Sequence, residues 1–107
     1  MSVQKVVLSD VDFDAETGEG LCIVCFGEPS DAECRKEHAL VEKAAEKVDA
    51  QIRLVSCQIE NCMAVAERFQ VTAVPTLLIL KDGREVERMA GFRHQKTLVR
   101  HLQKHCM

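Results

Sequence analysis

Short apolar runs recur along the chain at the length typical of β-strands. The segments predicted as strands are Val3–Leu8, Leu21–Phe26, Ile52–Ile59, Thr76–Leu80 and Glu85–Ala90. Leu21–Phe26 and Thr76–Leu80 are almost wholly apolar, which is typical of strands buried on both faces. Charged and apolar residues alternate in the last segment, and the Asp82-Gly83 pair before it is a hairpin signal. We therefore expect a sheet with buried central strands and a hairpin at one edge.

Helical periodicity and capping residues mark the segments between these strands. The predicted helices are Phe13–Glu16, a long segment from about Ser30 to Val48, Cys62–Phe69 and Gln95–His105. Ser9 and Asp10 are good N-cap residues for the first of them. Ser30 and Glu33 have the spacing of a capping box at the start of the long helix. Each helix is thus predicted to begin at a polar residue close to the end of a strand.

The predicted elements follow the order βαβαβαββα. Strands that alternate with helices pair in parallel through right-handed crossovers, so helices cover both faces of the sheet. The closing hairpin adds an antiparallel pair and makes the sheet mixed. The sequence therefore predicts an α/β fold with a central mixed five-stranded sheet, and 107 residues predict one domain over 1–107.

Charge and composition exclude several classes of function. The net charge of −3 offers no basic surface for phosphate backbones, so we expect no nucleic acid partner. No apolar run approaches the roughly 18 residues of a membrane span, and the first residues do not resemble a secretory signal. We therefore expect a cytoplasmic monomer whose six cysteines are free thiols, because the cytoplasm is reducing.

The segment Val71–Gly83 reads VTAVPTLLILKDG and, with the element order, resembles the thioredoxin family over essentially the whole chain. Aromatic or glycine residues that also match the family are Phe13, Phe26, Phe69 and Gly91. The resemblance implies the thioredoxin fold, with Pro75 as a cis-proline beside the active site. It also implies a groove bordered by Ser30, Val74, Pro75 and Thr76, in which an extended peptide binds by backbone hydrogen bonds.

The sequence departs from the family at the redox motif. The family's Trp-Cys-Gly-Pro-Cys falls on Ser30–Cys34, so Asp31 stands at the nucleophilic cysteine and only Cys34 remains. The family's buried aspartate falls on Cys25, and its lysine neighbour falls on Ser56. A dithiol reductase needs an attacking thiolate, a second thiol and acid–base help, and a carboxylate cannot attack a disulfide. We expect Asp31 to act as a helix cap or first-turn acid.

The remaining thiols leave several interpretations open. Cys34 is either a packing residue or a single reactive thiol, and Cys25 is its candidate disulfide partner. Cys22 and Cys25 spell C-x-x-C, but an odd step within a strand points them to opposite faces. Cys62 is expected to be exposed on the active-site side, as a regulatory thiol or the link of a disulfide dimer.

Histidines give a weaker signal. His101, His105 and Cys106 have helical metal-ligand spacing, but a solvated last helical turn and a fraying tail explain them better. His38 and His94 are expected on the surface. We predict no metal site and no cofactor.

Two main functions compete on this basis. The first is a protein- or peptide-binding module that uses the Pro75 groove and whose dithiol reductase activity lies near background. The alternative is a thiol–disulfide oxidoreductase acting through Cys34 alone or paired with Cys25, with glutathione or thioredoxin reductase as redox partner. A third interpretation is a thiol sensor through Cys62 or Cys34.

Overall fold

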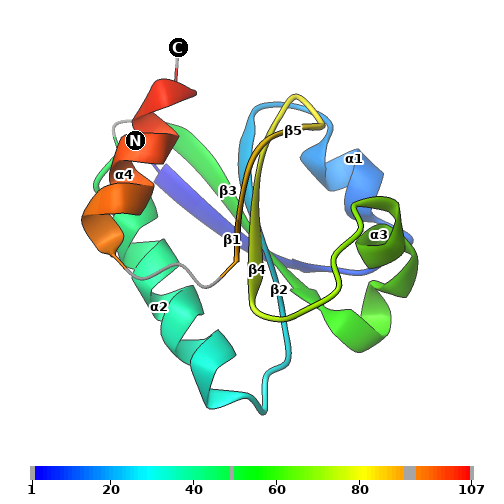
Figure 1. Cartoon of the computed structure of the whole chain (residues 1–107). Coiled ribbons are helices and arrows are strands. Elements are labelled where there is room, and N and C mark those ends of the chain that lie inside the picture. The colour runs from blue at the N-terminus through cyan, green and yellow to red at the C-terminus, as the bar shows by residue number, and fades with distance from the viewer. Residues whose placement is uncertain (1, 49, 91–93, 107) are drawn as a thin grey trace.

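The computed structural model describes residues 2–48, 50–90 and 94–106 (Figure 1). The strands are β1 (Ser2–Leu8), β2 (Leu21–Gly27), β3 (Gln51–Gln58), β4 (Thr76–Lys81) and β5 (Arg84–Ala90). The helices are α1 (Phe13–Thr17), α2 (Ala32–Glu46), α3 (Met63–Arg68) and α4 (Gln95–Lys104), with the 3-10 turn η1 (Ile59–Asn61) before α3. The predicted α/β order is confirmed, with η1 as an addition.

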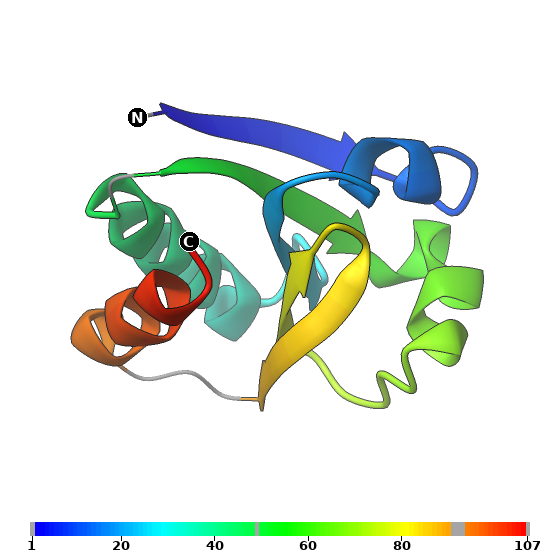
Figure 2. The same cartoon turned by 90° about the horizontal axis from the view of Figure 1, so that it is seen from above.

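The strands form one mixed sheet in the order β1-β3-β2-β4-β5. The β1, β3 and β2 strands run parallel, whereas β4 and β5 pair antiparallel, as the hairpin predicts. Figure 2 shows α2 and α4 on one side of the sheet and α1 and α3 on the other. On the α2 side, Val7, Ser56, Cys25 and Leu77 lie next to each other on successive strands. This row forms the floor beneath the N-terminal half of α2.

Two hydrophobic clusters hold the layers together. One joins the sheet to α2 and α4 and includes Val41 and Leu98, and the other joins it to α1 and α3 and includes Phe13. Cys22 belongs to the second cluster, whereas Cys25 packs against the first. The two cysteines therefore point to opposite faces of β2, as the strand periodicity predicts.

The helix caps differ from the prediction. Asp10 does not cap α1, because its carboxylate accepts hydrogen bonds from Ala64 N at 3.1 Å and Val65 N at 2.9 Å at the start of α3. Asp12 is the residue before α1. The long helix ends at Glu46, two residues before the expected end at Val48, and Gly91 lies outside the described residues. Local rules misassign Asp10 because its partners are more than fifty residues away in sequence.

The turn between β4 and β5 has the predicted chemistry. Asp82 has φ +52° and Gly83 has φ +84°, which is the backbone shape of a two-residue hairpin turn that asparagine, aspartate and glycine favour. The Asp82 carboxylate also accepts a hydrogen bond from Gly20 N at 2.8 Å. The hairpin is therefore tied to the loop that precedes β2.

One side of the last turn of α4 is attached to the sheet. Glu87 of β5 forms an ion pair with Lys104 Nζ at 3.0 Å, and its carboxylate also contacts His105 Nε2 at 3.5 Å and His101 Nδ1. Burial alone would raise the pKa of the Glu87 carboxyl, but Lys104 and the two imidazoles hold that pKa below its usual range. The expectation of a solvated helix end therefore holds for Gln103 and Lys104, which are exposed, but not for the half-buried His101 and His105.

We predict that Glu87→Gln lowers the free energy of unfolding by about 1 kcal/mol at pH 7, because the last turn of α4 loses its ion-pair partner on β5. A carboxyl whose folded pKa is depressed stabilises the fold above its unfolded pKa of about 4.3, and this contribution disappears as pH falls. Urea unfolding of both proteins from pH 7 to pH 3 measures the difference. A difference that persists unchanged at pH 3 contradicts the ion-pair account.

Candidate functional site

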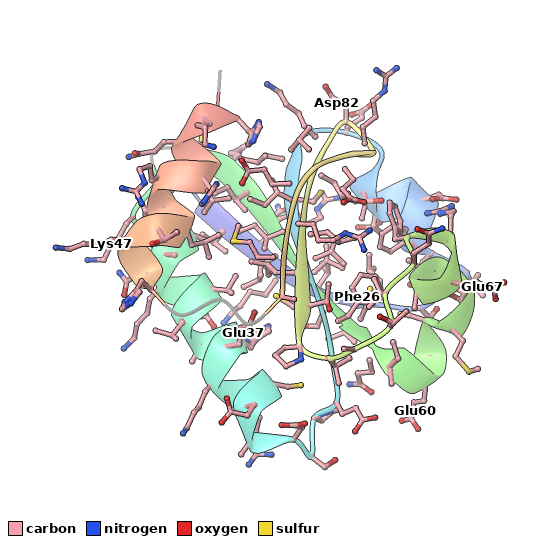
Figure 3. The ribbon with its side chains drawn as sticks, viewed as in Figure 1. Phe26, Glu37, Lys47, Glu60, Glu67 and Asp82 are labelled. Atoms are coloured by element: carbon pink, nitrogen blue, oxygen red, sulfur yellow. The ribbon has the colours of Figure 1, made fainter. Side chains whose placement is uncertain are left out.

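A cavity of about 300 Å³ lies between the first turns of α2 and the sheet. Its wall contains polar side chains, thiols and the proline that precedes β4. Among these residues are Cys25, Cys34, Glu37, His38, Ser56 and Pro75. The cavity extends to Val7 on the edge strand β1, and Val7 is 65% exposed. Figure 3 shows Glu37 on the side of α2 that faces the sheet. Strands and helix far apart in sequence therefore build one site.

The loop before β4 forms one border of the cavity. The Val74–Pro75 peptide bond is cis, and both Pro75 and Thr76 line the cavity. Thr76 Oγ1 donates a hydrogen bond to Ala73 O at 2.5 Å, which ties the loop around the proline. Ser30 is exposed and Val74 packs against the α1–α3 cluster, so neither lies in the cavity wall.

Asp31 is the N-cap of α2. Its Oδ1 accepts hydrogen bonds from Glu33 N at 2.8 Å and Cys34 N at 3.4 Å, while its backbone is extended. Aspartate is one of the best residues at this position, because it satisfies the N–H groups that have no partner within the helix. The cap predicted at Ser30 is therefore wrong by one residue, and the role expected of Asp31 is the observed one.

Cys34 lies in the first turn of α2, and the residue is 9% exposed. Its Sγ is 3.0 Å from the place where a Cβ on Gly27 would lie, so the absent side chain of Gly27 makes room for the thiol. Burial raises the pKa of Cys34, and the charges of Asp31, Glu28 and Glu37 raise it further, against one favourable backbone hydrogen bond. The surroundings of this thiol therefore oppose formation of the thiolate.

Cys25 lies in β2 on the floor of the same cavity. Burial raises the pKa of its thiol well above the usual range, and the charge of Glu37 and the nearby Cys34 act in the same direction. Both cysteines are free thiols in the structure. The fold thus places the two cysteines of the candidate disulfide in the wall of one cavity, in an environment that favours their neutral forms.

His38 and Glu37 are cavity residues that the sequence analysis missed. His38 is half-buried, with Nε2 at 2.9 Å from Ser56 Oγ, and Glu37 is buried. A signal was present, because His38 follows Cys34 by four residues and therefore lies on the same face of α2. The expectation of a surface histidine at this position is therefore wrong.

Cys62 is fully buried, so the prediction of an exposed thiol on the active-site side is wrong. Its Sγ donates a hydrogen bond to Leu8 O at 3.2 Å and also interacts with the thiol of Cys57. Burial raises the pKa of Cys62. Cys62 belongs to the hydrophobic cluster between the sheet and the α1–α3 side, which removes the basis for a regulatory thiol or a dimer link.

The tail cysteine also differs from expectation. Cys106 is half-buried, packs against the α2–α4 cluster and donates a hydrogen bond from Sγ to Leu102 O at 3.0 Å. Over residues 2–48, 50–90 and 94–106, no group of three or more histidine, cysteine or acidic residues is arranged to hold a metal ion. In the same part of the chain, no helix is long and apolar enough to span a membrane.

A family model described as Thioredoxin matches residues 4–104. The chain belongs to the thioredoxin family. The thioredoxin of Bacillus subtilis (strain 168) is 30% identical over 100 residues, which cover 94% of this chain and 96% of the relative. The thioredoxin of Staphylococcus aureus (strain Mu50 / ATCC 700699) is 27% identical over 105 residues, which cover 98% and 99%. These similarities extend over nearly the whole length of the relatives.

A solved structure supports the same fold. A mutant thioredoxin from Halobacterium salinarum NRC-1 superposes with a TM-score of 0.83 at 20% sequence identity, covering 97% of this chain and 92% of that chain. The thioredoxin fold predicted from the segment around Pro75 is therefore confirmed.

We predict that Asp31→Ala lowers the free energy of unfolding of this thioredoxin-family chain by about 1 kcal/mol, because α2 loses its cap. Ser30→Ala is the matched control, since Ser30 is exposed and adjacent, and its effect should stay within about 0.5 kcal/mol. Urea unfolding measures both. Equal losses in the two variants would argue against Asp31 as the cap.

Proposed function

We propose that this chain binds protein or peptide partners in the groove beside Pro75 and has lost the dithiol reductase chemistry of its family. The observation that carries the proposal is the Asp31 cap. By resemblance of the motif, Asp31 stands at the position of the nucleophilic cysteine, and its carboxylate is occupied with Glu33 N and Cys34 N. A carboxylate at that place stabilises the helix but cannot form a mixed disulfide.

The state of the remaining thiols supports the same proposal. Nucleophilic attack requires a thiolate, and helix N-termini usually favour one by lowering the thiol pKa. In this chain burial and the nearby carboxylates raise the pKa of Cys34 instead. Cys25 and Ser56 stand where the resemblance places the acid–base pair, and burial raises the pKa of Cys25 as well. Attack and proton transfer are both disfavoured.

The groove itself retains features suited to binding an extended segment. The backbone around Pro75 is fixed by the Thr76–Ala73 hydrogen bond, and the exposed Pro29 also lines the cavity. A fixed backbone can pair with a peptide backbone while adjacent pockets select side chains. Thioredoxins in general act on proteins, which agrees with a protein partner.

The second candidate is a single-thiol oxidoreductase, favoured by the presence of Cys34 in the cavity wall of a chain whose relatives are named thioredoxin. In that reaction the Cys34 thiolate attacks the glutathione sulfur of a mixed disulfide on a substrate protein, takes over the glutathione as a new mixed disulfide and releases the substrate thiolate; glutathione then attacks that mixed disulfide, releases Cys34 and leaves as glutathione disulfide. The raised pKa of Cys34 places this candidate second. A cytoplasmic location remains a prediction in either case.

We predict near-background reduction of insulin by the protein, with dithiothreitol or with thioredoxin reductase as the electron source, because Asp31 stands in place of the attacking thiol. Asp31→Cys should recover only part of the activity of a thioredoxin measured alongside, since Cys25 and Ser56 remain in place of the acid–base pair. Cys34→Ser serves as the blank. Robust turnover by the unaltered protein would refute the binding-module proposal.

A further inference from the structure

The cavity contains a polar pair that backbone binding at Pro75 does not use. Ser56 Oγ and His38 Nε2 lie 2.9 Å apart in its wall, joining β3 to α2. A hydroxyl offers one donor and two acceptor sites, whereas a ring nitrogen offers one of either kind. If His38 donates to Ser56, the hydroxyl proton is left for a ligand; if Ser56 donates, its lone pairs are left. In both arrangements Ser56 can bind a group that both donates and accepts.

The wall between Pro75 and Ser56 is suited to an uncharged ring. Across the sheet Ser56 is paired with Cys25, and Cys25 is paired with Leu77, two residues after Pro75. Cys25 and Cys34 line this part of the cavity, and burial raises the pKa of both thiols, which favours their neutral forms. Neutral sulfur packs favourably against aromatic rings. A volume of about 300 Å³ has room for one large side chain.

The charges around the cavity select against acidic ligands. Asp31, Glu28 and Glu37 place three carboxylates around Cys34. The guanidinium of Arg35 also lies in the wall, but it donates a hydrogen bond to a backbone carbonyl at 2.8 Å, so the carboxylates dominate the field. Such a field repels a carboxylate or a phosphate, while the apolar part of the wall disfavours the desolvation of an ammonium or guanidinium group. The ligand side chain that fits these charges is therefore uncharged and carries a polar group at its tip.

We propose that the cavity is a specificity pocket for one tyrosine side chain of the bound peptide. The ring lies against Pro75 and the thiols of Cys25 and Cys34, and the phenol hydroxyl hydrogen-bonds with Ser56. Tyrosine matches both requirements, since it buries a large ring and keeps a hydroxyl that donates and accepts. This inference rests on the proposed function, because it names the side chain that the Pro75 groove selects.

The chain itself makes the test simple, because it contains no tyrosine and no tryptophan. All emission characteristic of tyrosine then comes from the ligand. The probes are end-capped seven-residue peptides of an alanine–valine host sequence whose central residue is Tyr, Phe, Ala, Glu or Lys. Calorimetry gives their affinities, and the emission of the Tyr peptide reports its environment. We expect the Tyr peptide to bind about fivefold tighter than the Phe peptide, from one buried hydrogen bond.

Variants separate the pocket from the groove. Ser56→Ala should bring the affinity of the Tyr peptide down to that of the Phe peptide, whereas Ser9→Ala, the same change outside the cavity, should leave the preference intact. Cys25→Leu narrows the floor and should weaken the Tyr peptide more than the Ala peptide. Thermal melting verifies that each variant is folded.

The possible results divide cleanly between the two proposals. Equal binding of all five peptides, or tightest binding of the Glu or Lys peptide, overturns the tyrosine pocket and leaves peptide binding in place. A Tyr preference that survives Ser56→Ala also overturns it. If no peptide binds at all, the proposed function fails, and the pocket fails with it.

Discussion

The site depends on one interaction, the pair of hydrogen bonds from Glu33 N and Cys34 N to the Asp31 carboxylate. They satisfy the start of α2, and α2 in turn places Cys34 and His38 over the sheet. The same carboxylate adds to the negative field at Cys34. Asp31 therefore stabilises the start of the helix, but it disfavours a thiolate at Cys34 and cannot itself attack a disulfide.

The cysteines follow from the same balance of burial and charge. Cys25, Cys57 and Cys62 lie in strands or at a helix start that the fold covers, and burial raises the pKa of each thiol. A buried thiol behaves as a small apolar side chain with a weak donor. A large number of cysteines in a small domain therefore indicates little about redox chemistry until their environments are known. What the cavity offers to a ligand is shape, neutral sulfur and one hydroxyl–imidazole pair.

Elements with strong local signals could be predicted from the sequence. The apolar run of β2, the Asp82-Gly83 turn and the alternation of strands with helices each determine structure through neighbouring residues. The features that the sequence did not reveal depend on tertiary contacts. Asp10 caps α3, whose residues are more than fifty positions away in sequence. The Cys62 thiol points into the core and donates a hydrogen bond to a backbone carbonyl of β1. His38 contacts Ser56 because α2 packs on β3.

The proposed function depends on the protonated, poorly nucleophilic state of the Cys34 thiol at the start of a capped helix. Its most direct test is the rate of Cys34 alkylation by iodoacetamide as a function of pH, followed by mass mapping to separate the six cysteines. We predict a midpoint above the ordinary thiol value of about 8.5. A midpoint at or below that value would contradict this account of Cys34 and would favour the single-thiol oxidoreductase over the binding module.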